Sequence, residues 1–160
     1  MEGYSHYVSF KTGTTIDKKL IVSFLDECEM LLSKENLPEN IRFFGYKQTN
    51  QPAIDRRGLY LGIGVPPRYK HRGDDAEIIV SIDFDNKKPD RYPIYAITTH
   101  REEYDFVIGA IVLSLAHWLK DHVYATTDGD QSDENWKQAI SYYKYITERD
   151  DVNVFFAKRR

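Results

Sequence analysis

An apolar run from Phe106 to Leu119 limits what this chain can fold into more than any other segment. His117 is the one ionisable residue inside it, and acidic residues stand just before it. The run is too hydrophobic for a surface helix, which needs a polar face. A membrane-spanning helix needs roughly 20 apolar residues, and this run has about fourteen. The sequence therefore predicts a helix buried in the core of the protein.

The segments beside this run indicate where its helix begins and which elements come after it. Thr99 and Glu102 have the spacing of a capping box, in which two side chains bond the backbone at a helix start. After the run, Val123–Thr126 predicts a short strand, and the chain then enters the acidic turn Asp128–Glu134. No complete catalytic or cofactor motif accompanies this turn, so we expect it to be a place of recognition.

The composition indicates one folded domain over residues 1–160. Hydrophobic residues make up 41% of the chain and aromatic residues 14%, which excludes intrinsic disorder. A net charge of −3 provides no global field for nucleic acid. The single cysteine, Cys28, cannot form an internal disulfide, and the first residues lack the pattern of a secretory signal. We therefore expect a cytoplasmic protein with no membrane partner.

Periodic patterns predict the other elements. Strands are predicted at Tyr4–Phe10, Ile41–Lys47, Leu59–Val65, Glu77–Phe84, Ile94–Thr98, Val123–Thr126 and Val152–Ala157. Besides the core helix, helices are predicted from a cap at Thr14 or Thr15 to about Ser33, and from Trp136 to Ile146. Because four strand patterns follow one another directly, we predict an α+β fold (β-α-β-β-β-β-α-β-α-β). Its sheet should be mainly antiparallel, with the helices packed on one face.

Cys28 and the histidines do not predict a catalytic or metal site. Cys28 lies on the apolar stripe of the first helix beside Glu27 and Glu29, whose charges oppose thiolate formation, so a core position is favoured. The histidines lack the spacing of a zinc site, and we expect no metal and no cofactor; they are His6, His71, His100, His117 and His122.

The acidic turn begins like a calcium loop, with Asp128, Asp130 and Ser132 at alternate positions. A calcium loop needs Gly at its sixth position and Glu at its twelfth, and Asp133 and Ala139 stand there instead. The favoured interpretation is that Ser132 or Asp133 caps the next helix.

Asp83 and Asp85 share a face at the end of the predicted strand Glu77–Phe84. A pair of carboxylates performs acid–base or metal chemistry only when it converges with further groups, here His100 or the acidic turn. A small hydrolase built on this pair is one alternative hypothesis. An ordinary hairpin turn explains the same residues and is favoured.

Two basic loops stand at opposite ends of the predicted strand Leu59–Val65. One holds Arg56 and Arg57, and the other is Arg68-Tyr69-Lys70-His71-Arg72. Arg and Tyr suit phosphate contact and base stacking, and they are also enriched at protein interfaces. Since such a strand separates its ends by roughly 20 Å, the loops need not form one patch. A nucleic-acid-associated protein is the second alternative, with a protein interface favoured over RNA.

The segment Tyr104–Asp130 resembles the small cytoplasmic immunity proteins that are encoded beside bacterial polymorphic toxins of contact-dependent inhibition and type VI secretion systems. The resemblance is carried by the apolar helix, which begins Asp105-Phe-Val-Ile-Gly-Ala, by the short strand after it and by Asp128-Gly-Asp. It covers under a fifth of the chain. It implies a non-enzymatic inhibitor that binds a cognate toxin domain, and it assigns no individual contact residue.

The leading hypothesis is therefore a non-enzymatic binding protein, an immunity protein that occludes the active site of a toxin. Charge complementarity would steer its association with a basic toxin domain such as a nuclease. The first candidate surface is Asp128, Asp130, Asp133 and Glu134, and the second is Arg68, Tyr69 and Arg72.

Overall fold

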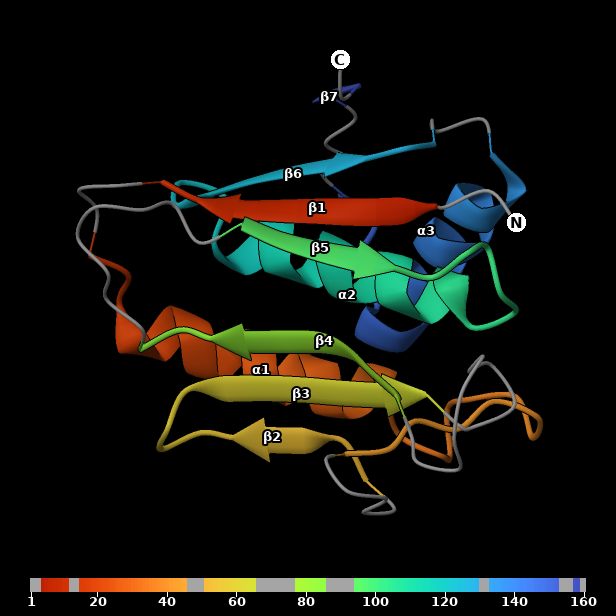
Figure 1. Cartoon of the computed structure of the whole chain (residues 1–160), viewed down its shortest axis with the longest axis horizontal. Coiled ribbons are helices and arrows are strands. Elements are labelled where there is room, and N and C mark those ends of the chain that lie inside the picture. Colours follow the sequence, from red (N-terminus) through yellow and green to blue (C-terminus); the bar gives the residue numbers. More distant parts are fainter. Residues whose placement is uncertain are drawn as a thin grey trace.

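The computed structural model describes residues 4–11, 15–45, 51–65, 77–85, 94–129, 133–152 and 157–158. These segments form three helices and seven strands, which confirms the predicted α+β class (Figure 1). In chain order the elements are β1 (Ser5–Phe10), α1 (Lys18–Leu31), β2 (Ala53–Asp55), β3 (Tyr60–Val65), β4 (Glu77–Asp83), β5 (Ile94–Thr98), α2 (Asp105–Trp118), β6 (Val123–Thr127), α3 (Glu134–Thr147) and β7 (Ala157–Lys158).

The strands divide into two sheets rather than one. The first has the order β5-β1-β6-β7, with β1 antiparallel to both neighbours and β7 parallel to β6. The second is the antiparallel meander β2-β3-β4. The sequence predicts a sheet whose strands pair with their neighbours along the chain. In the structure β1 lies between β5 and β6, which come many residues after it. The pairing of an N-terminal strand with distant strands leaves no local signal.

The register of the first sheet positions the candidate site. Ser5 lies opposite Thr98 on β5, and His6 lies opposite both Ile97 on β5 and Thr127 on β6. The start of β1 therefore meets the ends of β5 and β6. In Figure 1 these strand ends lie on the right, beside the starts of α2 and α3.

The predicted core helix is confirmed as α2, in which every residue from position 105 to 116 is buried. It contacts β1 and β6 and packs against both other helices. Gly109 allows the close approach of α3, since a Cβ at this position would lie 2.8 Å from the Cβ of Ala139. None of the helices in the described segments has the length and apolar character needed to cross a membrane.

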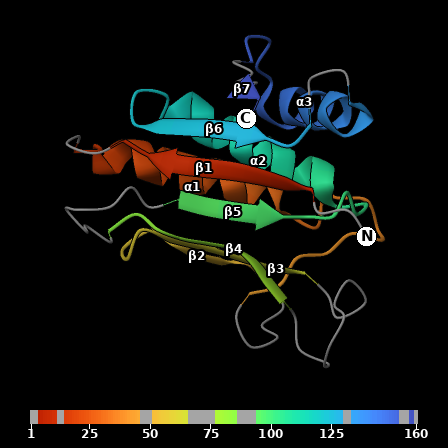
Figure 2. The ribbon, with the colours of Figure 1, turned by 45° about the horizontal axis from the view of Figure 1, so that its top comes forward.

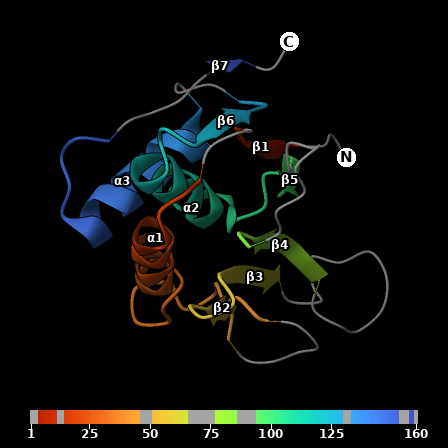
Figure 3. The same ribbon diagram turned by 90° about the vertical axis from the view of Figure 1, so that its left-hand side faces the viewer.

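The helices form a layer of their own beside the strands. Figure 2 shows α1 and α2 running side by side behind β1, and Figure 3 shows all three helices grouped together. α1 contacts β2, whereas α3 packs chiefly on α2 and more lightly on α1.

The predicted helix caps are corrected by the structure at two of the three helices. α1 begins at Lys18, and Asp17 caps it by accepting a hydrogen bond from the backbone N–H of Lys19 at 2.9 Å, so neither Thr14 nor Thr15 is the cap. At α2 the cap position belongs to Tyr104 rather than to Thr99. Asp133 holds the cap position of α3, as one of the two predicted residues, but its side chain makes no capping bond there.

Two strand predictions also differ from the structure. The described part of Ile41–Lys47 makes only a single bridge, between Phe44 and Gly64, where the β3–β4 register shifts and interrupts regular pairing. β2 was not predicted, because three residues are too few to show a period. Most of the predicted strand Val152–Ala157 lies outside the described residues.

Candidate functional site

The described acidic residues of the turn after β6 form a group that we call the acidic rim: Asp128, Asp133 and Glu134. Asp128 is exposed, and its Oδ2 accepts the backbone N–H of Ser5 at 3.0 Å. Asp133 Oδ2 lies 3.6 Å from Nη2 of Arg101. Glu134 is exposed in the first turn of α3, where the helix dipole favours a negative charge. The rim is thus tied to β1 on one side and to the loop before α2 on the other.

The other predicted partner-binding residues fall outside the described residues: Asp130, Arg68, Tyr69 and Arg72. Both residues of the first basic loop are described: Arg57 is exposed, whereas Arg56 pairs with Asp26 at 2.6 Å and with Glu29 at 2.5 Å on α1. The charge of Arg56 is therefore balanced within the protein, which removes this residue as a free phosphate contact.

Asp83 and Asp85 do not converge with His100 or with the acidic rim. Phe84, between them, packs edge-to-face on Phe10 at the end of β1, with ring centroids 5.6 Å apart. The rim and the loop that holds His100 bond the opposite end of this strand. Figure 1 shows β4 ending on the left, whereas β5 and β6 end on the right. The hydrolase hypothesis therefore loses the convergence that it requires.

Beneath the acidic rim lies a buried polar network, centred on His6, that the sequence did not reveal. His6 Nε2 lies 2.9 Å from Oδ1 of Asp105, and its Nδ1 lies 3.1 Å from Oγ1 of Thr127. Thr99 donates to the same carboxylate oxygen of Asp105, and Asn135 donates to Oδ2 at 3.1 Å. The network therefore joins β1, β6, α2 and α3 at one point.

Hydrogen-bond capacity fixes the proton positions in this network. Thr127 Oγ1 accepts from Nε1 of Trp136 at 3.3 Å and from the backbone N–H of Gly129 at 3.4 Å. Because these two donors use both lone pairs of the hydroxyl, its own proton points to Nδ1 of His6. We therefore assign the imidazole proton to Nε2, which donates to Asp105.

The order of hydroxyl, imidazole and carboxylate is that of a hydrolase triad, but this one is closed. Thr127 is 3% exposed, His6 0% and Asp105 2%. A substrate cannot reach a hydroxyl at this depth, and both of its lone pairs are already engaged. In this conformation the network can hold elements together, and it cannot perform nucleophilic catalysis.

The network keeps Asp105 ionised although it is buried. Burial by itself raises the pKa of this carboxyl, but the hydrogen bonds that His6, Thr99 and Asn135 donate to it outweigh this effect. The net result is a pKa below the ordinary value. A buried carboxylate satisfied on both oxygens gives the start of α2 a fixed orientation.

Tyr4 connects the buried network to the rim. Its ring packs edge-to-face on His6, with centroids 5.4 Å apart, and the guanidinium of Arg101 lies 4.3 Å above its ring centroid. Its hydroxyl is buried and has no hydrogen-bond partner among the described residues. Burial raises the pKa of Tyr4, and the nearby Thr127 hydroxyl partly opposes this, although the geometry between the two is not that of a hydrogen bond.

A second buried polar cluster joins the three helices. Glu27 on α1 accepts hydrogen bonds from Ser114 on α2, at 2.9 Å, and from Tyr143 on α3. Its other oxygen lies 2.5 Å from Nη1 of Arg149, just beyond α3. Burial raises the pKa of Tyr143, and the charge of Glu27 adds to the effect. The cluster is enclosed and explains helix packing rather than recognition.

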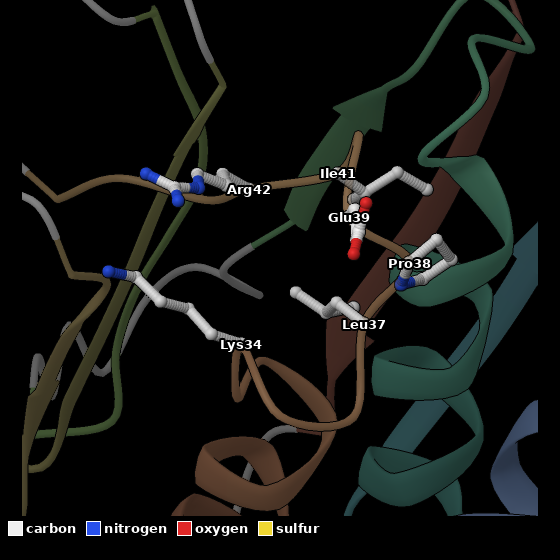
Figure 4. A pocket seen from close by; sticks show the side chains of 6 residues that line it. All are labelled: Lys34, Leu37, Pro38, Glu39, Ile41 and Arg42. Carbon is white, nitrogen blue, oxygen red and sulfur yellow. The ribbon is translucent and has the colours of Figure 1, made fainter.

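A shallow pocket of about 420 Å³ lies in the segment after α1 (Figure 4). It is lined by Lys34, Leu37, Pro38, Glu39, Ile41 and Arg42. Figure 4 shows Lys34 and Arg42 extending to the same side, away from Glu39. These six residues belong to one short segment, and the polar ones among them do not point to a common centre.

The expected core position of Cys28 is confirmed, since the residue is fully buried and burial raises the pKa of its thiol. Within the described segments, no three His, Cys, Asp or Glu side chains are grouped as a metal site would need. The sequence did hold one signal for the buried network. His6 falls on the same face of its strand as Val8 and Phe10, and a polar residue at a core position needs a partner.

Comparison with known proteins adds no evidence on function, so the inference of function depends on the structure and the acidic rim. No protein-family model matches this chain, and searches of curated proteins and of solved structures found no match.

Proposed function

We propose that this chain is a non-enzymatic binding protein, an immunity protein that acts in the bacterial cytoplasm and neutralises a cognate toxin domain. The observation that carries the proposal is the acidic rim, whose carboxylates are mounted on a buried network. Asp128 accepts a backbone hydrogen bond from β1, so this carboxylate is held in place before any partner arrives, and Asp133 faces Arg101. A preorganised surface loses less conformational entropy on binding than a flexible one.

The chemistry of the described residues supports binding over catalysis. The one hydroxyl–imidazole–carboxylate arrangement found among them is buried at Thr127, His6 and Asp105. The described rim, by contrast, offers carboxylates to solvent, and Glu134 and Asp128 are exposed. Exposed carboxylates attract a basic surface and speed its approach, as an inhibitor of a nuclease-like toxin requires.

The proposal is tested by co-expression with the product of the neighbouring gene. We expect a complex that survives purification, and cells that are protected from the toxicity of that product. The double variant Asp128→Asn/Glu134→Gln should protect less well. A matched control, Asp85→Asn/Asp121→Asn, removes the same charge from exposed positions at the other end of the molecule and should protect fully. Absence of both complex and protection would reject the proposal.

A further inference from the structure

We infer that the acidic rim recognises an arginine side chain of the protein partner between Tyr4 and Asp133, and that Arg101 occupies this place in the free protein. The inference rests on the proposed function for the partner being a toxin domain. The recognition of a guanidinium group itself depends only on the contacts of Tyr4, Arg101, Gly129 and Asp133.

Arg101 shows that a guanidinium group fits this position. Its Cζ lies 4.3 Å from the centroid of the Tyr4 ring, which is the stacked geometry of a cation–π contact. Its Nη2 lies 3.6 Å from Oδ2 of Asp133. That separation is an ion pair and is too long for a hydrogen bond. The Arg101 side chain is 54% exposed, so it is held loosely enough to be displaced.

The hydroxyl of Tyr4 indicates that the position is incompletely satisfied by Arg101. The residue is 2% exposed, and its hydroxyl has no hydrogen-bond partner within the described part of the chain. A buried polar atom normally has a hydrogen-bond partner in the protein, because that partner replaces the water that the atom loses on burial. With Arg101 stacked over the ring the hydroxyl is closed to solvent, so a donor from outside the chain can reach it only after the Arg101 side chain has moved away.

Gly129 lets this hydroxyl and the carboxylate of Asp133 both lie against the backbone, because it has no Cβ. A Cβ on Gly129 would clash with the hydroxyl oxygen of Tyr4 and with Oδ2 of Asp133. Both oxygens therefore lie close to the same point beside Gly129, where no Cβ fits. An arginine has five N–H donors in a planar fork, so one guanidinium can donate to both oxygens while it stacks on a ring.

The loop that carries Arg101 is compatible with its release. His100 and Arg101 both have left-handed backbone angles, with φ of 53° and 58°, which residues with a Cβ rarely adopt. The loop is held instead by Thr99 and His100, whose backbone N–H groups bond the carbonyl of Tyr4 at 3.0 and 3.3 Å. These anchors do not involve the Arg101 side chain, so it can swing away while the loop stays in place.

The test uses a fluorescently labelled hexa-arginine peptide, with hexa-glutamate as the negative probe, and follows binding by anisotropy. Removing the internal competitor in Arg101→Met should tighten hexa-arginine binding roughly two- to fivefold, the range expected for one exposed charge pair. Arg57→Met is the matched control, because it removes one positive charge from an exposed turn at another place. It should change the affinity less than Arg101→Met does.

Second substitutions test whether the tighter peptide binding arises at the proposed position. Adding Asp133→Asn or Tyr4→Phe to Arg101→Met should abolish most of the tightening, and Arg101→Gln should reproduce it if the Met variant folds poorly. Binding by Arg101→Met that is weaker than wild type, or no tighter than Arg57→Met, would overturn the inference. Tightened peptide binding without any complex with the neighbouring gene product would instead reject the toxin as partner and leave the arginine position standing.

Discussion

His6 and Asp105 are ionisable residues that the fold buries almost completely. The hydrogen bond between them offsets part of the cost of burying each one. The imidazole donates from Nε2 to the carboxylate, and Thr99 and Asn135 complete its hydrogen bonds. A buried carboxylate with its hydrogen-bond donors is seldom more stable than well-packed apolar residues, but removing one partner leaves the other group unsatisfied. The pair therefore specifies where α2 starts relative to β1.

The first prediction concerns this pair. Asp105→Asn should lower the free energy of unfolding by about 2–4 kcal/mol, because an amide cannot accept from all the donors that surround the carboxylate and so leaves buried donors of His6, Thr99 or Asn135 without a partner. Urea denaturation followed by circular dichroism measures the change. Asp121→Asn, at an exposed position beyond α2, should stay within about 0.5 kcal/mol of the wild type. A small effect at both positions would mean that the network does not fix the start of α2.

The second prediction is the pH dependence of stability. The pKa of Asp105 in the folded protein lies below its ordinary value of about 3.8. Between these two pKa values the unfolded chain binds a proton that the folded protein does not, so stability falls as the pH falls through this interval. Above the ordinary value the contribution of Asp105 is fully present. Unfolding free energies measured from about pH 6 downward should therefore decline below about pH 4.

A comparison of variants assigns this decline. The stability difference between wild type and Asp105→Asn should shrink as the pH falls, since the wild-type carboxyl becomes neutral as well. A constant difference across the acid range would contradict the role given to the Asp105 carboxylate.

Among the secondary-structure elements, α2 and α3 make a contact that depends on one missing side chain. Gly109 lies where a Cβ would come within 2.8 Å of the Cβ of Ala139, and Trp136 lies next to it at 3.5 Å. Both helices also meet at the Asn135–Asp105 hydrogen bond. The two helices therefore approach more closely than alanine would permit.

The third prediction follows from this approach. Gly109→Ala should destabilise the protein by about 1–3 kcal/mol through overpacking, even though alanine favours a helix by about 1 kcal/mol over glycine. Thermal and urea unfolding measure the change. The double variant Gly109→Ala/Ala139→Gly restores the space and should show a coupling energy that recovers part of the loss. If the two substitutions are simply additive, the contact does not limit the approach.

The helices could be predicted because their signals are local. The apolar run predicts α2, and the spacing of Trp136, Ala139 and Tyr143 predicts α3, each from residues of a single short segment. These three residues of α3 are buried where it packs on α2. The caps were harder to predict. Thr99 and Glu102 have the spacing of a capping box, yet Thr99 turns inward to Asp105, because a buried carboxylate is the stronger acceptor.

The sheets and the site required contacts that no local pattern contains. The division into two sheets depends on β1 pairing with β5 and β6 far along the chain. The pair His6 and Asp105 is separated by 99 residues, so nothing in either segment predicts the other. The acidic turn was predicted as the place of recognition, and the structure adds that Arg101 already faces it.

Taken as a whole, the molecule gathers the features that would serve binding at one of its ends. The start of β1, the ends of β5 and β6, and the starts of α2 and α3 meet there, with the buried network inside and the acidic rim outside (Figure 1). The rim carboxylates are charged groups, and those of Asp128 and Glu134 are exposed, so their effect on a partner should be electrostatic and dependent on salt.

The fourth prediction concerns this electrostatic effect. It is measured by calorimetric titration of the protein with the purified domain encoded by the neighbouring gene, at low and at high salt. We predict binding that weakens as salt rises. The variant Asp128→Asn/Glu134→Gln should weaken low-salt binding roughly two- to tenfold, the range for two exposed charges, whereas Asp85→Asn/Asp121→Asn leaves it unchanged. No heat of binding, or an affinity that the rim substitutions and the salt concentration leave unaltered, would contradict the role proposed for the acidic rim.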